Sequence, residues 1–243
     1  DDTTWVAPNR TALEQILTIA SSFYHMAKIT VNLQKSILFH NNPNDPDPIL
    51  FQDQPVYNLP TKHTFRFLGT YIDHSIDNRY VIKKLKQDFI KELNKLKFSK
   101  ITEKQAIYII NSVLLTQLRY QLSNTYLNLT NCQSLTRRYS SIVKQKATLA
   151  RCTPNSLLFH PHTYALTNTY QLQQTHHASI LENLLNSPIS PPTFKLRLQQ
   201  LQNNAFTNAS ILTDPPTFTY KEHKTFTAHL ITNIHQLNIQ YTN

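Results

Sequence analysis

The spacing of apolar residues changes along the chain and divides it into segments of different expected structure. Between residues 8 and 28 the spacing is three and four, which places Leu13, Ile16, Leu17, Ala20, Phe23, Tyr24 and Ala27 in one stripe of an amphipathic helix. Residues 29–39 are rich in β-branched side chains and too short for a long helix, so they predict one or two strands. Residues 48–59 and 63–73 predict two more short strands, and Pro55 makes the first of these an edge strand.

From about residue 76 the apolar spacing becomes helical and stays helical. Residues 78–98 place six apolar side chains on one face, opposite lysines: Val81, Ile82, Leu85, Phe89, Leu93 and Leu96. A capping-box pattern, Thr102 followed by Gln105, begins a second, strongly apolar helix. After a third helix at about 132–151 the pattern is interrupted. Two or three further helices are expected, separated by proline-containing links, at about 167–186, 193–205 and 220–240.

This order of elements predicts an α+β fold, in which short antiparallel strands and one helix precede an all-α part. We expect three regions, which are residues 1–75 with the strands, residues 76–155 with the first helices, and a helical C-terminal extension at residues 156–243. A chain of 243 residues is long enough to bury a hydrophobic core in one elongated domain or in two smaller ones.

The composition excludes several classes of protein. The hydrophobic content of 40% is too high for a disordered tail, and no stretch has the roughly 18–20 apolar residues that a membrane-crossing helix needs. The two cysteines, Cys132 and Cys152, are far apart in sequence and form no CxxC motif, which favours reduced thiols. We therefore expect an intracellular protein, nuclear or cytoplasmic, that is neither secreted nor bound to a membrane.

The distribution of charge is strongly uneven. Residues 79–151 contain fifteen Lys and Arg and three acidic side chains, whereas residues 1–78 carry a net charge of −3 and residues 152–243 a net charge of +1. A basic segment attracts the phosphate backbone of a nucleic acid, because each neutralised phosphate releases counterions. A solvated helical surface would carry the same charges, and the composition alone leaves both interpretations open.

The chain opens with two adjacent carboxylates, Asp1 and Asp2, with no initiator methionine before them. Carboxylate oxygens suit Mg²⁺, and in nucleotidyl transfer two such ions activate the attacking hydroxyl and stabilise the leaving oxygen. Such a site needs a further carboxylate from another strand, because neighbours on a strand point to opposite faces. By itself an Asp–Asp pair is more often a surface turn than a metal site.

Two later motifs change the meaning of the aspartate pair. Asn32, Lys35 and Ser36 form an N-x-x-K-S pattern after the first predicted helix, and the triplet Phe67, Leu68 and Gly69 follows it. In this order the three motifs resemble the reverse transcriptases of non-LTR (LINE-like) retrotransposons. The stretch 107–122 also resembles the thumb region of these enzymes, so the resemblance covers residues 1 to about 150 well and the remainder more loosely.

The resemblance implies an RNA-directed DNA polymerase and assigns roles to particular residues. Asp1 and Asp2 would bind the two catalytic Mg²⁺ ions of the palm, with Asp1 as the more direct ligand. Lys35 would lie near the nucleoside triphosphate and help to protonate the departing pyrophosphate. The triplet 67–69 would form the primer grip, in which the backbone of the chain's sole glycine lies close to the primer strand.

The resemblance also divides the chain and names its partners. Residues 1–75 would be the C-terminal part of the palm, residues 76–155 the thumb, and residues 156–243 a helical extension. The thumb would grip the backbone of an RNA template and a DNA primer without reading sequence, and the complete enzyme would bind a dNTP. Its contacts are expected from seven basic side chains: Lys83, Lys84, Lys86, Arg137, Arg138, Lys144 and Lys146.

Parts of the family's pattern have no counterpart in this sequence. The aromatic-x dipeptide before the aspartates, the strand with the third catalytic aspartate and the fingers are absent, so we expect the N-terminal half of the polymerase to be missing. This fragment alone is therefore expected not to polymerise DNA. Two alternatives remain: a non-catalytic module that binds nucleic acid through its basic helices, and a degenerate remnant of a retroelement.

Two weaker signals have simpler explanations. A zinc site could be assembled from Cys152, His160, His162, His176 and His177, but their spacing fits no standard zinc finger. Aromatic residues interleave the basic helices, and they could stack on nucleic-acid bases. Helical spacing favours packing in the core for these side chains, which are Tyr108, Tyr120 and Tyr139.

Overall fold

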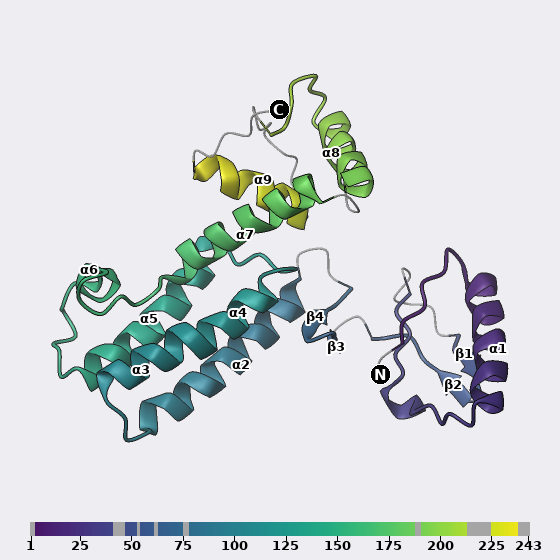
Figure 1. The fold of residues 1–243 in the computed structure, drawn as a ribbon, viewed down its shortest axis with the longest axis horizontal. Coiled ribbons are helices and arrows are strands. Elements are labelled where there is room, and N and C mark those ends of the chain that lie inside the picture. Colours follow the sequence, from purple (N-terminus) through teal and green to yellow (C-terminus); the bar gives the residue numbers. More distant parts are fainter. Residues whose placement is uncertain are drawn as a thin grey trace. The chain divides into compact units, whose positions relative to one another are not determined.

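The computed structural model describes residues 3–40, 47–52, 54–60, 63–74, 78–187, 191–212 and 225–237. The described chain has an α+β fold, as predicted, in which helices predominate and two antiparallel sheets have two strands each (Figure 1). It divides into an N-terminal unit, residues 1–66 with 72–75, and a helical unit, residues 67–71 with 76–243. The assignment of these parts to a palm and a thumb stays a prediction.

The N-terminal unit begins with helix α1 (Arg10–Met26), which confirms the first helix of the sequence analysis. Three aromatic rings hold the preceding segment against this helix and the first strand. The ring of Trp5 lies 6.2 Å from that of Tyr24 and 6.1 Å from that of Phe51, in edge-to-face arrangements. Because edge-to-face packing is favourable, this triangle fixes the chain just after the aspartate pair.

The predicted strand at 48–59 is a hairpin of two strands. Strand β1 (Ile49–Phe51) pairs antiparallel with β2 (Gln54–Val56), and Leu50 stands opposite Pro55. Each strand of a two-stranded sheet is an edge, so Pro55 lies at an edge as predicted. The segment 63–73 is likewise a hairpin, of β3 (Phe65–Phe67) and β4 (Thr70–Ile72), instead of one strand.

The prediction of one or two strands over residues 29–39 was wrong. The structure has a short 3₁₀ turn, η1 (Leu33–Lys35), and a single bridge from Leu38 to Asn58. Lys28 ends α1 in a left-handed conformation with φ of 55°, and the Ser36 hydroxyl donates to the carbonyl of Asn32 at 3.3 Å. This hydrogen bond curls the backbone locally, so the segment cannot run beside another strand for its full length.

The helical unit is built on the side-by-side helices α2 (Arg79–Phe98), α3 (Glu103–Ile109), α4 (Leu115–Gln121) and α5 (Leu129–Lys146) (Figure 1). The predicted capping box is confirmed, since Thr102 and Gln105 exchange both hydrogen bonds. The predicted face of α2 is also confirmed, because five of its six apolar side chains are buried and the sixth, Ile82, packs against the same core. The third helix starts and ends earlier than the predicted 132–151, since Asn128 caps it.

A π turn, η2 (Ile110–Leu114), joins α3 to α4. The backbone N–H of Leu115 donates to the carbonyl of Ile110, five residues earlier, so this turn holds one residue more than an α-helical turn. The Asn111 side chain lies within it and binds the segment that follows α6, donating to Ala165 at 2.9 Å and accepting from the backbone N–H of Thr167 at 3.1 Å. The sequence pattern predicted an uninterrupted helix here.

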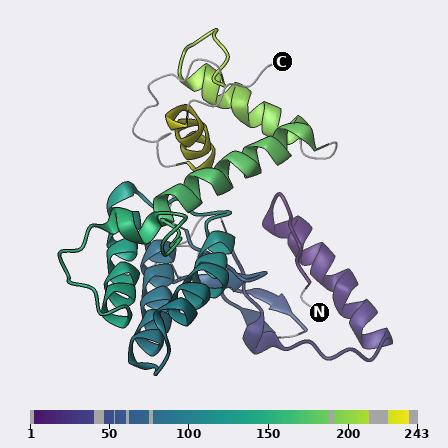
Figure 2. The same ribbon diagram turned by 60° about the vertical axis from the view of Figure 1, so that its left-hand side comes forward.

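The described part of the helical unit has four further helices: α6 (Asn155–Phe159), α7 (Thr169–Asn186), α8 (Pro191–Asn204) and α9 (Phe226–Gln236). The last three confirm the helices predicted in the extension. Helix α7 packs on α4 and α5 on one side and on α8 and α9 on the other, as Figures 1 and 2 show. The buried core of the bundle includes Leu158 and Leu166, so it continues past the predicted boundary at residue 155.

Two buried polar arrangements join α7 to the bundle. The hydroxyl of Tyr139 donates to the carbonyl of Thr167 at 2.7 Å and accepts from the backbone N–H of Thr169 at 3.1 Å. The amide of Gln173 accepts from the backbone N–H of Leu127 at 2.8 Å and donates to the carbonyl of the same residue at 2.9 Å. Because the buried polar groups of Tyr139 and Gln173 all have hydrogen-bond partners, these contacts fix how the extension meets the bundle.

Candidate nucleic-acid interface

The turn between β3 and β4 carries the third predicted motif and has a strained backbone. Leu68 and Gly69 have φ of 45° and 86°, as a two-residue type I′ turn requires. Glycine adopts a positive φ without an energetic cost, whereas leucine is strained in this conformation. The Leu68 side chain is also 63% exposed, so burial of its apolar surface does not offset the strain.

Two side chains of helix α4 hold this turn by hydrogen bonds to the carbonyl groups of Leu68 and Gly69. The hydroxyl of Tyr120 donates to the carbonyl of Leu68 at 2.5 Å, and the side-chain amide of Gln121 donates to the carbonyl of Gly69 at 2.5 Å. A Cβ atom at Gly69 would lie 3.1 Å from Cε1 of Tyr120. The close approach of the sole glycine is therefore to the chain's own tyrosine, and its predicted approach to a primer strand stays untested.

A third contact fixes strand β4 to helix α2. The hydroxyl of Tyr71 donates to Oδ2 of Asp88 at 2.8 Å, and Nζ of Lys84 lies 3.1 Å from the other oxygen of that carboxylate. The Asp88 carboxylate raises the pKa of Lys84 through this hydrogen bond and its charge. Lys84, one of the seven predicted nucleic-acid contacts, therefore already has an anionic partner within the chain.

The other predicted cations divide into two groups. Lys86 donates to the side chain of Asn131 at 3.0 Å, and Lys144 and Lys146 donate to backbone carbonyls of Arg151 and Ser99. These three side chains cap or cross-link helices and are half-buried. The remaining three are exposed and have no hydrogen bond or ion pair with any described residue, and they are Lys83, Arg137 and Arg138.

The charge of this region is reinforced by an absence of carboxylates. Residues 104–181 contain no Asp or Glu, although they contain seven Lys and Arg. Apart from Lys104, which follows Glu103, the cations of this stretch have no carboxylate close to them in sequence. The stretch 104–181 therefore carries a net charge of +7, which attracts a polyanion.

The first two predicted motifs are placed only in part. Lys35 is exposed at the end of η1, and Asp1 and Asp2 lie outside the described residues. Within the ranges that the structure describes, no group of three His, Cys, Asp or Glu side chains is arranged to hold a metal ion. The predicted Mg²⁺ ions depend on the aspartate pair, so the structure gives no test of their fit.

A histidine and a serine lie close together at the end of α4, which is the arrangement of a nucleophile and its base. His176 has Ser123 Oγ at 3.0 Å from Nε2 and accepts from Nε of Arg119 at 3.2 Å through Nδ1. Since Arg119 can only donate, the neutral ring carries its proton on Nε2 and cannot take one from the serine. Burial and the Arg119 charge also lower the pKa of His176. This group therefore has a structural role.

His177 lies at the centre of the contact between α7 and α9. Its Nε2 donates to the carbonyl of Leu122 at 3.0 Å, and its Nδ1 accepts from the side-chain amide of Asn233 at 2.8 Å. Burial is the largest influence on this ring and lowers its pKa to about 4. The neutral form therefore dominates at pH 7, and the ring serves as a two-sided hydrogen-bonding group that ties α9 to the bundle.

The tyrosines of the basic helices have different environments. Tyr139 is buried in the core, as predicted, whereas Tyr108 and Tyr120 are 68% and 52% exposed. The prediction of core packing was therefore wrong for these two. No local sequence pattern indicates that Tyr120 and Gln121 hold the turn at Gly69, because the contacts join positions 52 residues apart.

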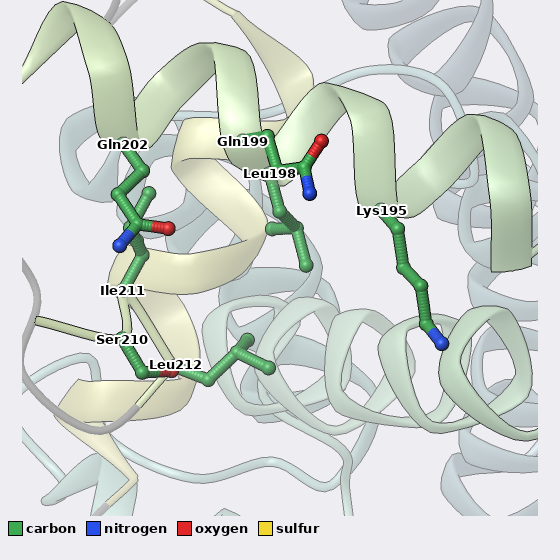
Figure 3. A pocket seen from close by; sticks show the side chains of 7 residues that line it. All are labelled: Lys195, Leu198, Gln199, Gln202, Ser210, Ile211 and Leu212. Carbon is green, nitrogen blue, oxygen red and sulfur yellow. The ribbon is translucent and has the colours of Figure 1, made fainter. Parts of the chain in front are cut away.

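A small pocket lies along α8, between this helix and the segment before α9 (Figure 3). Its volume is about 180 Å³, and Lys195 is the only charged side chain among its lining residues, which include Gln202 and Ile211. The Gln202 amide already donates to the carbonyl of Ala209 at 3.0 Å. Ligand pockets usually measure roughly 300–1,000 Å³, so this pocket is too small and too poor in converging polar groups for a substrate site.

Comparison with protein-family models, with curated proteins and with solved structures finds no match to this chain. Among the described helices, none has both the length and the apolar character that crossing a membrane requires.

Proposed function

We propose that residues 1–243 supply palm and thumb elements of an RNA-directed DNA polymerase of the non-LTR retrotransposon type. The observation that carries the proposal is the order of three motifs: the aspartate pair, the N-x-x-K-S pattern that contains Lys35, and the Phe67–Gly69 triplet. The third motif forms a tight hairpin turn held on a basic helical bundle, which is compatible with a primer grip next to a thumb.

In the complete enzyme the chain would contribute groups of three kinds. Asp1 and Asp2 would hold the two Mg²⁺ ions, which activate the primer hydroxyl and stabilise the leaving pyrophosphate. Lys35 would contact the triphosphate, where its exposed ammonium group can reach a phosphate. The hairpin turn would position the primer end, and its three anchors on α2 and α4 would keep that position fixed.

A second candidate is a non-catalytic module that binds nucleic acid. Three exposed cations, Lys83, Arg137 and Arg138, and the acid-free stretch 104–181 favour binding to phosphate backbone without requiring any metal. Four of the seven predicted contact residues are engaged within the chain, so binding is expected to depend on the three that are not.

Binding of a labelled RNA–DNA template–primer, measured by fluorescence anisotropy at several salt concentrations, tests both candidates. Replacement of Lys83, Arg137 and Arg138 by alanine should weaken binding. It should also reduce the slope of the logarithm of the binding constant against the logarithm of the salt concentration, by the equivalent of up to about three phosphate contacts. The matched control replaces Lys195 and Arg197 of α8, two exposed or half-exposed cations outside the basic segment, and should change binding little.

Magnesium separates the two candidates. If the polymerase proposal is right, Mg²⁺ at constant ionic strength strengthens binding of the template–primer with dNTP, and Asp1→Ala with Asp2→Ala abolishes only that gain. Binding that is unaffected by Mg²⁺ and by these substitutions would favour the non-catalytic module. Absence of salt-dependent binding would contradict both.

A further inference from the structure

The π turn η2 determines which side chains of α3 and α4 face solvent together. An α-helix rotates by about 100° per residue, so Tyr108 and Tyr120 would lie about 120° apart on an uninterrupted helix. The one extra residue of the π turn removes one such step, which leaves the two tyrosines about 20° apart. They therefore share one face of the helix.

The burial of the neighbouring residues agrees with this realignment. Leu115 and Leu118 are almost completely buried, although an uninterrupted helix would direct them toward the side of Tyr108. The residues that the realigned helix places between and beside the tyrosines are exposed, and they are Lys104, Val113 and Thr116. The exposed face from Lys104 to Tyr120 is here called the tyrosine stripe.

The tyrosine stripe continues onto the hairpin turn. The hydroxyl of Tyr120 holds the carbonyl of Leu68, and the Gly69 backbone packs against the edge of the same ring. The ring is therefore fixed in orientation while half of its surface stays open. Leu68, whose carbonyl Tyr120 binds, is exposed and has a strained backbone, so it adds an apolar side chain to the exposed surface of the turn. Strain of this kind that burial does not offset is characteristic of functional positions.

The stripe and its surroundings match one class of partner. Exposed aromatic rings offer flat surfaces on which unpaired bases stack, while Lys104 and Arg119 supply positive charge for the backbone between them. Within α3, η2 and α4 the single carboxylate is that of Glu103, in the first turn of α3, so phosphates meet little repulsion along the rest of the stripe. Bases in a duplex are already stacked on one another, so these rings can take only unpaired bases.

We propose that the tyrosine stripe, with Leu68, binds a single-stranded polynucleotide by stacking bases on Tyr108 and Tyr120. This surface lies on α3, α4 and the hairpin, and it needs neither the metal ions nor the aspartate pair of the polymerase proposal. The stripe proposal shares with the polymerase proposal only the premise that the chain binds nucleic acid.

The test compares the affinities of labelled dT12, U12 and a 12-base-pair duplex by fluorescence anisotropy. Tyr108→Leu and Tyr120→Leu keep apolar volume but remove the ring, and each should weaken binding to either single strand by about five- to a hundred-fold. Binding to the duplex should change less than about twofold. Tyr108→Phe keeps the ring and should bind as the wild type does. The relative affinities for dT12 and U12 show whether the strand is DNA or RNA.

Two matched variants make the result specific. Phe98→Leu removes a ring that is also exposed but belongs to α2 and not to the stripe, and it should leave binding unchanged. Leu68→Asn replaces a strained residue by one that type I′ turns favour, so it should raise the melting temperature while it weakens single-strand binding by a few-fold.

Tyr108 has no hydrogen bond or ring contact with any described residue, so Tyr108→Leu is not expected to affect folding, which circular dichroism checks. The proposal is overturned if this variant binds single strands as tightly as the wild type. It is also overturned if single-strand and duplex affinities fall equally, or if Phe98→Leu weakens binding as much. Loss of the Mg²⁺ effect with an intact stripe would contradict only the polymerase proposal.

Discussion

At the scale of single residues, Gly69 is the position where backbone conformation and packing both exclude a side chain. Its φ of 86° is unfavourable for any L residue, and an added Cβ would press on the ring of Tyr120. We expect Gly69→Ala to lower the free energy of unfolding by about 1–3 kcal/mol. In a double-mutant cycle measured by urea denaturation, Tyr120→Ala should relieve part of this loss. Strictly additive effects would show that the ring does not contribute.

His177 makes a second residue-scale prediction, for the dependence of stability on pH. The folded ring has a pKa of about 4, below the usual value of 6.5, so the unfolded chain binds more protons between these values. The contribution of this residue to stability is therefore complete above about pH 6.5 and is lost as the pH falls toward 4.

The measurement is the melting temperature at pH 7 and at pH 5. The wild type should lose more stability between these two values than His177→Gln, which cannot be protonated. Equal losses in the two proteins would mean that other groups are responsible. His176, whose pKa is lowered as well, would contribute in the same direction, and His176→Gln measures its share.

At the scale of elements, the π turn gives an unusual expectation for deletions. Removing Ser112, which is exposed, should convert η2 to an ordinary helical turn and keep Leu115, Leu118 and Leu122 in the core. We expect a change in unfolding free energy of less than about 1 kcal/mol. Deletion of the exposed Gln133 in the regular helix α5 should instead rotate buried residues into solvent and prevent cooperative thermal unfolding. Similar losses for both deletions would contradict the assigned role of η2.

The same element shows why the sequence predicted helices well and their details less well. The bounds of α1, α2 and α7 follow from local spacing and, for α1 and α7, from the capping residues Asn9 and Asn168. The π turn depends on a clamp between Asn111 and residues more than fifty positions away, which no local pattern reveals. The prediction of strands at 29–39 was wrong for a related reason. A strand needs a partner to pair with, and β-branched composition alone supplies none.

In the candidate site, too, features set by local sequence could be predicted, and features set by tertiary contacts could not. The motif Phe67–Gly69 could be found from the sequence because it is a short local pattern, which also contains the chain's sole glycine. Of the seven basic residues predicted as nucleic-acid contacts, four have partners within the chain, and side-chain partners depend on tertiary packing. That Tyr108 and Tyr120 share one exposed face could not be predicted, because their alignment follows from the π turn.

At the scale of the whole molecule, the two units differ greatly in their buried apolar content. Between residues 3 and 66 the described buried hydrophobic side chains are Ile49 and Phe51, whereas the bundle alone buries eighteen core residues. Because apolar burial is the main favourable contribution to folding, the two units should differ in whether each folds stably by itself.

We therefore expect residues 67–243 to unfold cooperatively by themselves, with a melting temperature within a few degrees of the full chain's. Residues 1–66 alone should give no cooperative transition. Circular dichroism and differential scanning calorimetry of the two fragments check this. A cooperative transition in the short fragment would mean that its aromatic triangle of Trp5, Tyr24 and Phe51 stabilises it more than its buried area indicates.

The clamp of Gln173 on Leu127 has a consequence for the rate at which backbone protons exchange with solvent. Leu127 lies outside every helix, where amide protons normally exchange fast, yet its N–H is buried and bonded to a side chain of another element. Its exchange requires α7 to separate from the bundle. This single loop amide is therefore expected to exchange as slowly as those at the centre of α5, and its rate reports how often the extension detaches.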